Sequence, residues 1–449
     1  MRILKSVAAA LCVVVLSVSP AWGQSLIRDA EIEQLLRDFT DPLLEAAGLV
    51  PADVSLYIVN DPNINAFVTG GQNIFVNTGT ILQADRPLQL KAVLAHEAGH
   101  IAGGHIARSG DAVNNARNTM FVTMGLGILA ALAGEGGAAG ALMASSSQFG
   151  TASFFTYTQP QESAADQAGL RYLEATGQSG EGLIEFFERF RAEELMRPAR
   201  RMDYFRSHPP PSNRIGALRG PVAESPYYGQ PDPEDDALQL RRVQAKIYGF
   251  LVEPQFVYFR YPETDQSLPA RYARAVAYYR DARFDEGREE LDWLIEQEPD
   301  NPFFQELYGQ MLFESGQAEE SIPYHARSVD LLPTSALLRV NIARSLIEME
   351  DEASIAQAND HLRVAVDIEP RNGFAWYLRS IVHERQGDTA LAQLAIAEQY
   401  YSVGQAPTAI RFASLALPSL EQGSRDWDRA TQIISWAQQE GGLDQRRVR

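Results

Sequence analysis

Apolar side chains follow two different periods along the N-terminal part of the chain. Residues 32–44 carry them at helical spacing, which predicts an amphipathic helix with one buried face. Residues 54–59 form a short apolar run that is typical of a strand, and residues 65–69 and 73–77 are predicted as a hairpin that turns at Gly70-Gly71. The pattern therefore predicts a small sheet beside at least one helix.

A second amphipathic helix is predicted from Leu90 to Ile101, where apolar positions again recur at helical spacing without a breaker. Residues 121–147 are apolar and rich in glycine. This segment is predicted either as a buried helical hairpin or as a mobile flap or membrane-touching element. Its uninterrupted run, residues 121–133, would give about 20 Å of helix, which is too short to cross a bilayer.

The last third of the chain repeats. Pro299, Pro333 and Pro370 are separated by 34 and 37 residues, which matches the tetratricopeptide period of about 34 residues. Repeats that begin at residues 268, 302, 336 and 373 place a small residue at the eighth position each time: Ala275, Gly309, Ala343 and Ser380. Residues after 406 are predicted to form a capping pair of helices. Such repeats stack into a solenoid that binds proteins or peptides, or else supports the preceding domain.

Between these regions, residues 220–236 are rich in proline and acids, residues 237–252 are predicted as a helix, and residues 253–269 as an irregular stretch. The predicted organisation is a signal peptide, an N-terminal domain, a linker with a helix, and a repeat domain. Their predicted bounds are residues 1–23, 24–220, 221–267 and 268–449.

The chemistry is concentrated in His96-Glu97-Ala98-Gly99-His100, within the second helix. Two histidines four residues apart differ by only about 40° around a helix, so both imidazoles can bind one metal ion. Glu97 then lies beside the open coordination position, where a general base is needed. This is the H-E-x-x-H arrangement of zinc peptidases, in which zinc activates a water molecule and the glutamate takes its proton.

Two classes that share this motif are excluded by other residues. Metzincins require a third histidine at the position that Ile106 occupies here, and His105 is interpreted as a structural or outer-shell residue because a continued helix would turn it about 140° away from His100. Membrane-bound ATP-dependent proteases need a phosphate-binding loop that ends in Gly-Lys. The three lysines of this chain, Lys5, Lys91 and Lys246, do not follow a glycine.

A third class takes its last metal ligand from a glutamate on a later helix. Glu162 and Asp166 are again four residues apart and share one helix face. Glu162 is the candidate third ligand, and Asp166 is expected either to hydrogen-bond a ligand histidine or to donate a proton. Spacing alone leaves open a solvated helix face with two acids.

These motifs resemble the HtpX-type and prenyl-protease-type zinc metallopeptidases. The resemblance covers residues 27–220. Two more segments match motifs of that family: the strand pair at residues 65–79, and Ser207-His208-Pro209 together with Arg214. It implies a zincin-like domain in which one Zn2+ is bound by His96, His100 and Glu162, with Glu97 as general base and Asp166 as supporting acid. It also implies that His208 approaches the metal or stabilises the transition state, and that Arg214 anchors that loop or assists the oxyanion. From the residues alone, His208 before three prolines is as well explained by a turn.

The fold class that follows is α+β, mostly α. A zincin-like metallopeptidase domain with a small sheet precedes an α-solenoid of tetratricopeptide repeats. A sheet edge beside the zinc cleft is expected to bind an extended peptide, with Gly70, Gly71, Gln72 and Asn73 as the candidate contact residues.

The N-terminal residues and the overall charge predict the cellular compartment and exclude some classes of partner. Arg2 and Lys5, an apolar run and Ala21-Trp22-Gly23 predict a secretory signal, and its removal would take with it Cys12, the only cysteine. Thiol catalysis and disulfides are then excluded, and a periplasmic location is expected. The formal charge of −19 would become −21, so nucleic acid is not expected as a partner and membrane association is at most peripheral.

A secreted peptidase of this family that also carries such repeats is expected to act in outer-membrane protein quality control. The resemblance implies that outer-membrane β-barrel proteins are substrates, that the repeats dock on the barrel-assembly machinery, and that the chain also assists assembly. The alternative is a largely non-proteolytic periplasmic chaperone or scaffold with a latent zinc site, closed by His208 as a fourth ligand.

Overall fold

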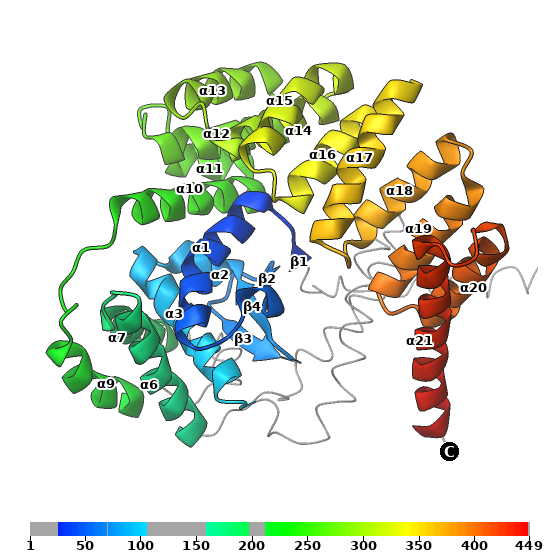
Figure 1. Cartoon of the computed structure of the whole chain (residues 1–449). Helices are drawn as coiled ribbons and strands as arrows, with labels where there is room; N and C mark the ends of the chain where they lie inside the picture. Colours follow the sequence, from blue (N-terminus) through cyan, green and yellow to red (C-terminus); the bar gives the residue numbers. More distant parts are fainter. Residues whose placement is uncertain (1–25, 70, 106–158, 197–211, 448–449) are drawn as a thin grey trace, which may run out of the picture.

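The computed structural model describes residues 26–69, 71–105, 159–196 and 212–447. Within them the chain is mostly helical, with a four-stranded sheet near the N-terminus (Figure 1). The predicted α+β, mostly α fold class is therefore confirmed. The predicted signal segment, Gly70, the apolar segment 121–147 and His208 lie outside the described residues.

The sheet consists of β1 (Leu26–Ile27), β2 (Ser55–Val59), β3 (Ala66–Thr69) and β4 (Asn73–Asn77), in the order β1-β2-β4-β3. β2 pairs in parallel with β4, and the other two pairs are antiparallel. The predicted hairpin is thus confirmed as β3 and β4. β3 forms one edge of the sheet and contacts α3 (Pro87–Ala102).

Helices cover the sheet and bury one continuous apolar core with it. The first, α1 (Ala30–Ala46), begins where the Asp29 carboxylate accepts hydrogen bonds from the backbone N–H groups of Glu31 and Ile32, which is a helix N-cap. α3 is buried along nearly its whole length, so the polar residues on it need partners inside the protein. The other helices of this N-terminal unit are α2 (Thr78–Gln83), α6 (Gln159–Ala175), α7 (Glu181–Met196) and α9 (Ser212–Glu224).

The segment between this unit and the repeats is more ordered than the sequence suggested. α9 continues past Gly220 to Glu224, and α10 (Glu234–Leu251) confirms the predicted helix. The prediction of an irregular stretch at residues 253–269 is wrong in part, because α11 (Pro254–Arg260) forms there. Pro254 is the first residue of α11, where a missing backbone N–H costs nothing and the fixed φ favours a helix.

The predicted repeats are confirmed as consecutive antiparallel helix pairs. The first helices of the four predicted repeats begin at residues 268, 302, 336 and 373, and Ala275, Gly309, Ala343 and Ser380 are buried at the eighth positions. In Figure 1 these pairs follow one another in an arc around the N-terminal unit. The helices are α12 (Leu268–Arg280), α13 (Phe284–Gln297), α14 (Pro302–Glu314), α15 (Ala318–Leu331), α16 (Ala336–Glu348), α17 (Glu352–Ile368), α18 (Gly373–Arg385), α19 (Thr389–Ser402), α20 (Ala406–Ala416) and α21 (Arg425–Arg447).

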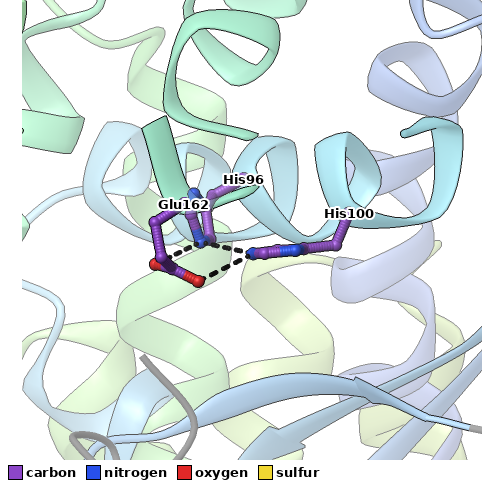
Figure 2. Close-up of side chains that lie close together, drawn as sticks. All are labelled: His96, His100 and Glu162. Atoms are coloured by element: carbon purple, nitrogen blue, oxygen red, sulfur yellow. Dashed lines mark hydrogen bonds and ion pairs between the residues drawn. The ribbon is translucent and has the colours of Figure 1, made fainter. Parts of the chain in front are cut away.

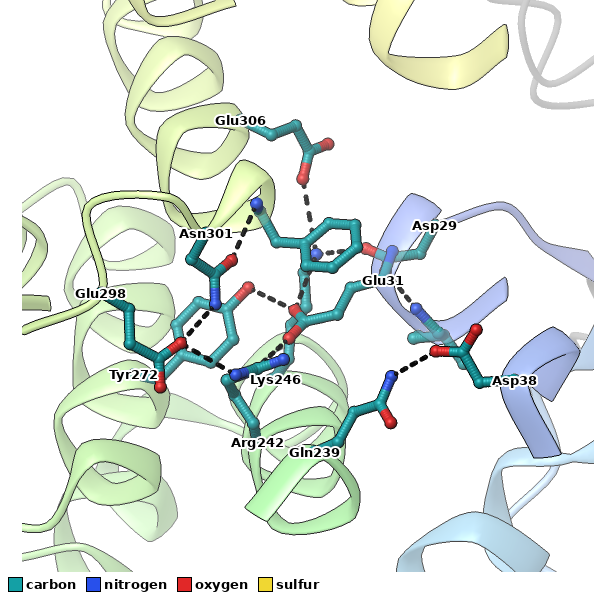
Figure 3. Close-up of polar contacts among 12 residues, drawn as sticks. Asp29, Glu31, Asp38, Gln239, Arg242, Lys246, Tyr272, Glu298, Asn301 and Glu306 are labelled. Carbon is teal, nitrogen blue, oxygen red and sulfur yellow. Dashed lines mark hydrogen bonds and ion pairs between the residues drawn. The ribbon is translucent and has the colours of Figure 1, made fainter. Parts of the chain in front are cut away.

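The N-terminal unit and the repeats meet at a buried cluster of charged side chains, drawn in Figure 3, which we call the junction. Lys246 on α10 is 1% exposed, and its Nζ lies 2.8 Å from Asp29 Oδ2, 3.5 Å from Glu31 Oε2 and 3.4 Å from Glu306 Oε2. The junction comprises Asp29, Glu31, Arg242, Lys246, Tyr272, Glu298 and Glu306.

Two cations of the junction thus serve four carboxylates. Arg242 donates to Glu31 (2.8 Å) and Glu298 (3.0 Å), and the Tyr272 hydroxyl donates to Glu31 (2.7 Å). Because these residues come from α1, α10, α12, α14 and the turn before α14, the junction ties helices far apart in sequence into one buried network. A buried network of this kind stabilises the interface only if all its members remain paired.

Candidate metal centre

The two histidines of the H-E-x-x-H motif lie together on one side of α3. Both are buried, and His96 Nε2 lies 3.0 Å from His100 Nε2 (Figure 2). Four-residue spacing on a helix accounts for this meeting, as the sequence predicted. Glu97, between them, is fully buried on the same helix.

Glu162 reaches the two imidazoles from the neighbouring helix α6. Its Oε1 lies 3.3 Å from His100 Nε2 and its Oε2 lies 3.6 Å from His96 Nε2. α3 and α6 can approach so closely because residue 99 is glycine: a Cβ there would lie 2.8 Å from the backbone oxygen of Ala165. The small residue inside the motif therefore brings the carboxylate of α6 to the histidines of α3.

The spacing of these three side chains fits a zinc ion. With metal–ligand bonds of about 2.0–2.2 Å, neighbouring ligand atoms of a tetrahedral site lie roughly 3.3 Å apart. The three separations here, 3.0, 3.3 and 3.6 Å, span that value. Two imidazoles and a carboxylate are also a donor set that leaves the fourth position of a catalytic zinc open. His96, His100 and Glu162 could therefore hold the ion.

Asp166 lies one helical turn beyond Glu162 and contacts His96 from the other side. Its Oδ1 is 2.9 Å from His96 Nδ1, which leaves His96 Nε2 directed at Glu162 and His100. Burial lowers the pKa of His96, although the hydrogen bond to Asp166 opposes this, so the ring is held in the neutral form that a metal needs. The contact favours the first of the two expected roles of Asp166, which is to orient a ligand histidine.

Arg214 on α9 joins the two carboxylates of α6. It donates to both oxygens of Asp166, from Nε (2.7 Å) and Nη2 (2.6 Å), and its Nη1 lies 2.5 Å from Glu162 Oε2. Burial alone would raise the pKa of Asp166, but hydrogen bonds from Arg214 and His96 outweigh it and lower that pKa. Asp166 is therefore held as a carboxylate, which makes it a poor proton donor. Arg214 thus contacts the carboxylates of both Asp166 and Glu162, which in turn contact the two histidines.

One residue of the site was not predicted from the sequence. Phe187 on α7 is 1% exposed, and its ring lies under the Arg214 guanidinium, with Cζ 4.3 Å from the ring centroid. The same ring meets His96 edge-on, with centroids 6.4 Å apart. Phe187 thus packs against both the orienting arginine and a candidate ligand. In the sequence it is one apolar residue among others on α7, so no signal distinguished it.

The remaining predicted site residues lie in two places. His105 is buried with its Nδ1 2.9 Å from His100 Nδ1, so it contacts a candidate ligand rather than replacing one. Gly71 and Gln72 form the turn between β3 and β4, and Asn73 lies on the inner strand β4. The free edge beside them is β3. A cleft of about 840 Å³ between α6 and α9 is lined by Glu162, Asp166 and Arg214 among others.

The similarities to known proteins differ between the N-terminal unit and the repeats. Residues 27–222 match the model of peptidase family M48. This part of the chain, which is less than half of its length, is similar to M48 peptidases. This match covers α1, the sheet and every helix that contributes to the cluster, from α3 to α9. The comparison supports a metallopeptidase.

Curated relatives extend the likeness into the repeats. A putative β-barrel assembly-enhancing protease of Vibrio cholerae is 26% identical over 412 residues, which are 90% of this chain and 83% of the relative. The β-barrel assembly-enhancing protease of Escherichia coli K12 is 24% identical over 405 residues, 89% of this chain and 81% of its own. Metalloprotease LoiP of the same organism is 29% identical over 175 residues, 38% of this chain and 62% of its own. In the described part of the chain, every helix is too short or too polar to cross a membrane.

Proposed function

We propose that this chain is an exported zinc endopeptidase that acts on outer-membrane β-barrel proteins. The observation that carries the proposal is the meeting of His96, His100 and Glu162 at separations of 3.0–3.6 Å in the interior of a unit that is similar to M48 peptidases. Buried carboxylate and imidazole groups at this spacing match a catalytic zinc site.

The chemistry divides among the side chains of the cluster. When bound, zinc would polarise the scissile carbonyl and lower the pKa of a water molecule. Glu97, which is buried on α3 between the two histidines, would take a proton from that water as general base and return it to the leaving amine. Asp166 keeps His96 in the tautomer that presents Nε2, and Arg214 holds Asp166 and Glu162 in place.

The substrate is expected to bind as an extended chain along β3. β3 ends the sheet and lies against α3, which carries Glu97. Hydrogen bonds to a strand edge use backbone groups only, so they give affinity with little sequence preference. This suits an enzyme for unfolded or misassembled proteins. The edge is residues 66–69, next to the predicted contact residues Gly71 and Gln72.

The proposed client class rests on the relatives and on the repeats. Proteins named β-barrel assembly-enhancing proteases align with about nine-tenths of this chain, so the aligned part extends into the helix pairs that begin with α12. We infer that the repeats dock the enzyme on outer-membrane proteins or their assembly machinery in the periplasm, and that the zinc site degrades those that fail to assemble.

A single substitution tests the catalytic part of this proposal. Glu97→Gln is expected to retain bound zinc but to lose casein cleavage by at least about a hundredfold, the usual contribution of a general base. Glu45→Gln, an exposed change on α1, is the matched control and should cleave like wild type. Cleavage by Glu97→Gln at the wild-type rate would remove Glu97 from the base role. If a strain that lacks the protein regains barrel assembly with Glu97→Gln, the chaperone alternative gains support.

A further inference from the structure

The chain reverses direction directly after the metal-binding helix. α3 ends at Ala102, and the backbone N–H groups of Gly104 and His105 donate to the carbonyls of Ile101 (2.9 Å) and His100 (3.2 Å). This is the hydrogen-bond pattern of a Schellman motif, in which one residue adopts the left-handed conformation. Here that residue is Gly104, with φ of 60°. The turn directs His105 back toward the helix it has just left.

The turn brings the ring of His105 against the second candidate ligand. His105 Nδ1 lies 2.9 Å from His100 Nδ1, and the two rings are nearly perpendicular, at 77°. The ring also lies directly over Gly103, where a Cβ would come within 2.5 Å of His105 Nε2. Both glycines are therefore needed: Gly104 for the turn, and Gly103 for the space that the imidazole occupies.

This contact engages the one nitrogen of His100 that faces away from the donor cluster. His100 Nε2 is the atom directed at Glu162 and His96, so Nδ1 must carry the proton when Nε2 binds a metal. An N–H at Nδ1 needs an acceptor in a buried site. The partner at 2.9 Å, His105 Nδ1, can accept it in the tautomer that keeps its own proton on Nε2.

We propose that His105 is a positioning residue of the metal centre, which fixes the tautomer and orientation of His100 as Asp166 does for His96. Each ligand histidine then has its own orienting partner at 2.9 Å, one a carboxylate from α6 and the other an imidazole from the turn after α3. The inference rests on the proposed zinc site. It gives Gly103-Gly104-His105, which follow the H-E-x-x-H motif, a role in holding the second ligand histidine.

Three variants of the full-length protein separate this role from simple packing. His105→Leu keeps a branched side chain of similar reach but removes the acceptor. His105→Asn places an oxygen where Nδ1 stands and should therefore rescue binding. Gly103→Ala leaves the histidine but displaces its ring. His361→Leu, a half-buried change in the repeats, controls for the loss of a histidine.

The measurements are zinc affinity by competition with a chelator, and the visible spectrum of the cobalt-substituted protein. His105→Leu and Gly103→Ala are expected to bind zinc about 10–100-fold more weakly than wild type, the usual effect of losing an outer partner of a ligand. His105→Asn should remain within about threefold of wild type, with a wild-type cobalt spectrum.

Unchanged zinc affinity in His105→Leu, or equal losses in His105→Leu and His105→Asn, would overturn the positioning role while leaving the zinc site itself intact. If wild type binds no zinc through His96, His100 and Glu162, the proposed function fails as well, so the two failures are distinguishable. Should His105→Leu not fold, Gly103→Ala and His105→Asn decide the question, because the proposal requires the first to bind weakly and the second to bind normally.

Discussion

Replacement of Lys246 by methionine should loosen the attachment of the repeats to the peptidase domain. The ammonium of Lys246 is the only cation within 3.5 Å of Glu306 in the described part of the chain, and it also lies 2.8 Å from Asp29. Methionine fills a similar volume without the charge. Asp29, Glu31 and Glu306 would then lose a shared cation in a site where Glu31 and Glu306 are buried and Asp29 is largely so.

The expected loss can be scaled from the burial of the site. Removing one partner of a buried ion pair costs about 3–5 kcal/mol, because the other charge is left without compensation. Lys246 serves three carboxylates, so we expect a loss of unfolding free energy within that range. Lys91 is the matched comparison: it is also buried, but its Nζ lies 2.6 Å from a single carboxylate, that of Asp236, which is a quarter exposed, so its removal leaves less uncompensated charge in the interior.

The assay is urea unfolding at pH 8, above the pKa of about 7 of Glu306, followed by far-UV circular dichroism, for wild type, Lys246→Met and Lys91→Met. Lys246→Met should unfold at a clearly lower urea concentration than Lys91→Met. Limited proteolysis of Lys246→Met should also release the repeats from the peptidase domain faster than it does in wild type. Equal stabilities for the two methionine variants would refute the reasoning that the junction holds the two units together.

Two further predictions concern a junction carboxylate and the metal centre. Burial, with Asp29 and Glu31 close by, raises the pKa of Glu306 to about 7 despite Lys246, so the folded state binds a proton that the unfolded state releases near pH 4.5. The contribution of Glu306 to the free energy of unfolding should be fully present below pH 4.5 and should fall by up to about 1.4 kcal/mol per pH unit between pH 4.5 and pH 7. A Glu306→Gln variant should lack this pH-dependent loss in urea midpoints measured from pH 5 to 8. Parallel pH profiles for the two proteins would contradict the prediction. Arg214→Lys should weaken zinc binding at least tenfold in chelator competition, because lysine cannot make the two parallel bonds to Asp166, and wild-type affinity in that variant would show that the arginine does not position the carboxylates.

Local patterns predicted the elements that carry the site. The H-E-x-x-H spacing predicted that His96 and His100 would meet on α3, and the four-residue spacing of Glu162 and Asp166 predicted a shared helix face. The repeat period predicted where each helix pair begins. These predictions succeed because helix spacing and repeat period depend on residues that are close in sequence.

Other contacts of the site and of the junction were not predicted from such patterns. His105 is interpreted from the sequence as a structural or outer-shell residue, turned about 140° away from His100 on a continued helix. Gly103 and Gly104 instead end α3 and return the chain, and this glycine pair is the signal that could have indicated the contact. Lys246 and Glu306 had no local relation that could predict their pairing, since it depends on how α10 packs on α14. The contacts of Phe187 with Arg214 and His96 likewise form only when α7 packs against α9 and α3.

The most direct test of this account is the location of the metal itself. Crystals of the full-length protein, with diffraction data collected on both sides of the zinc absorption edge, should give one anomalous peak per chain. The account predicts that the peak lies within about 2.0–2.2 Å of His96 Nε2, His100 Nε2 and a carboxylate oxygen of Glu162. A zinc peak bound by other side chains, with Glu162 paired only to Arg214, would contradict it.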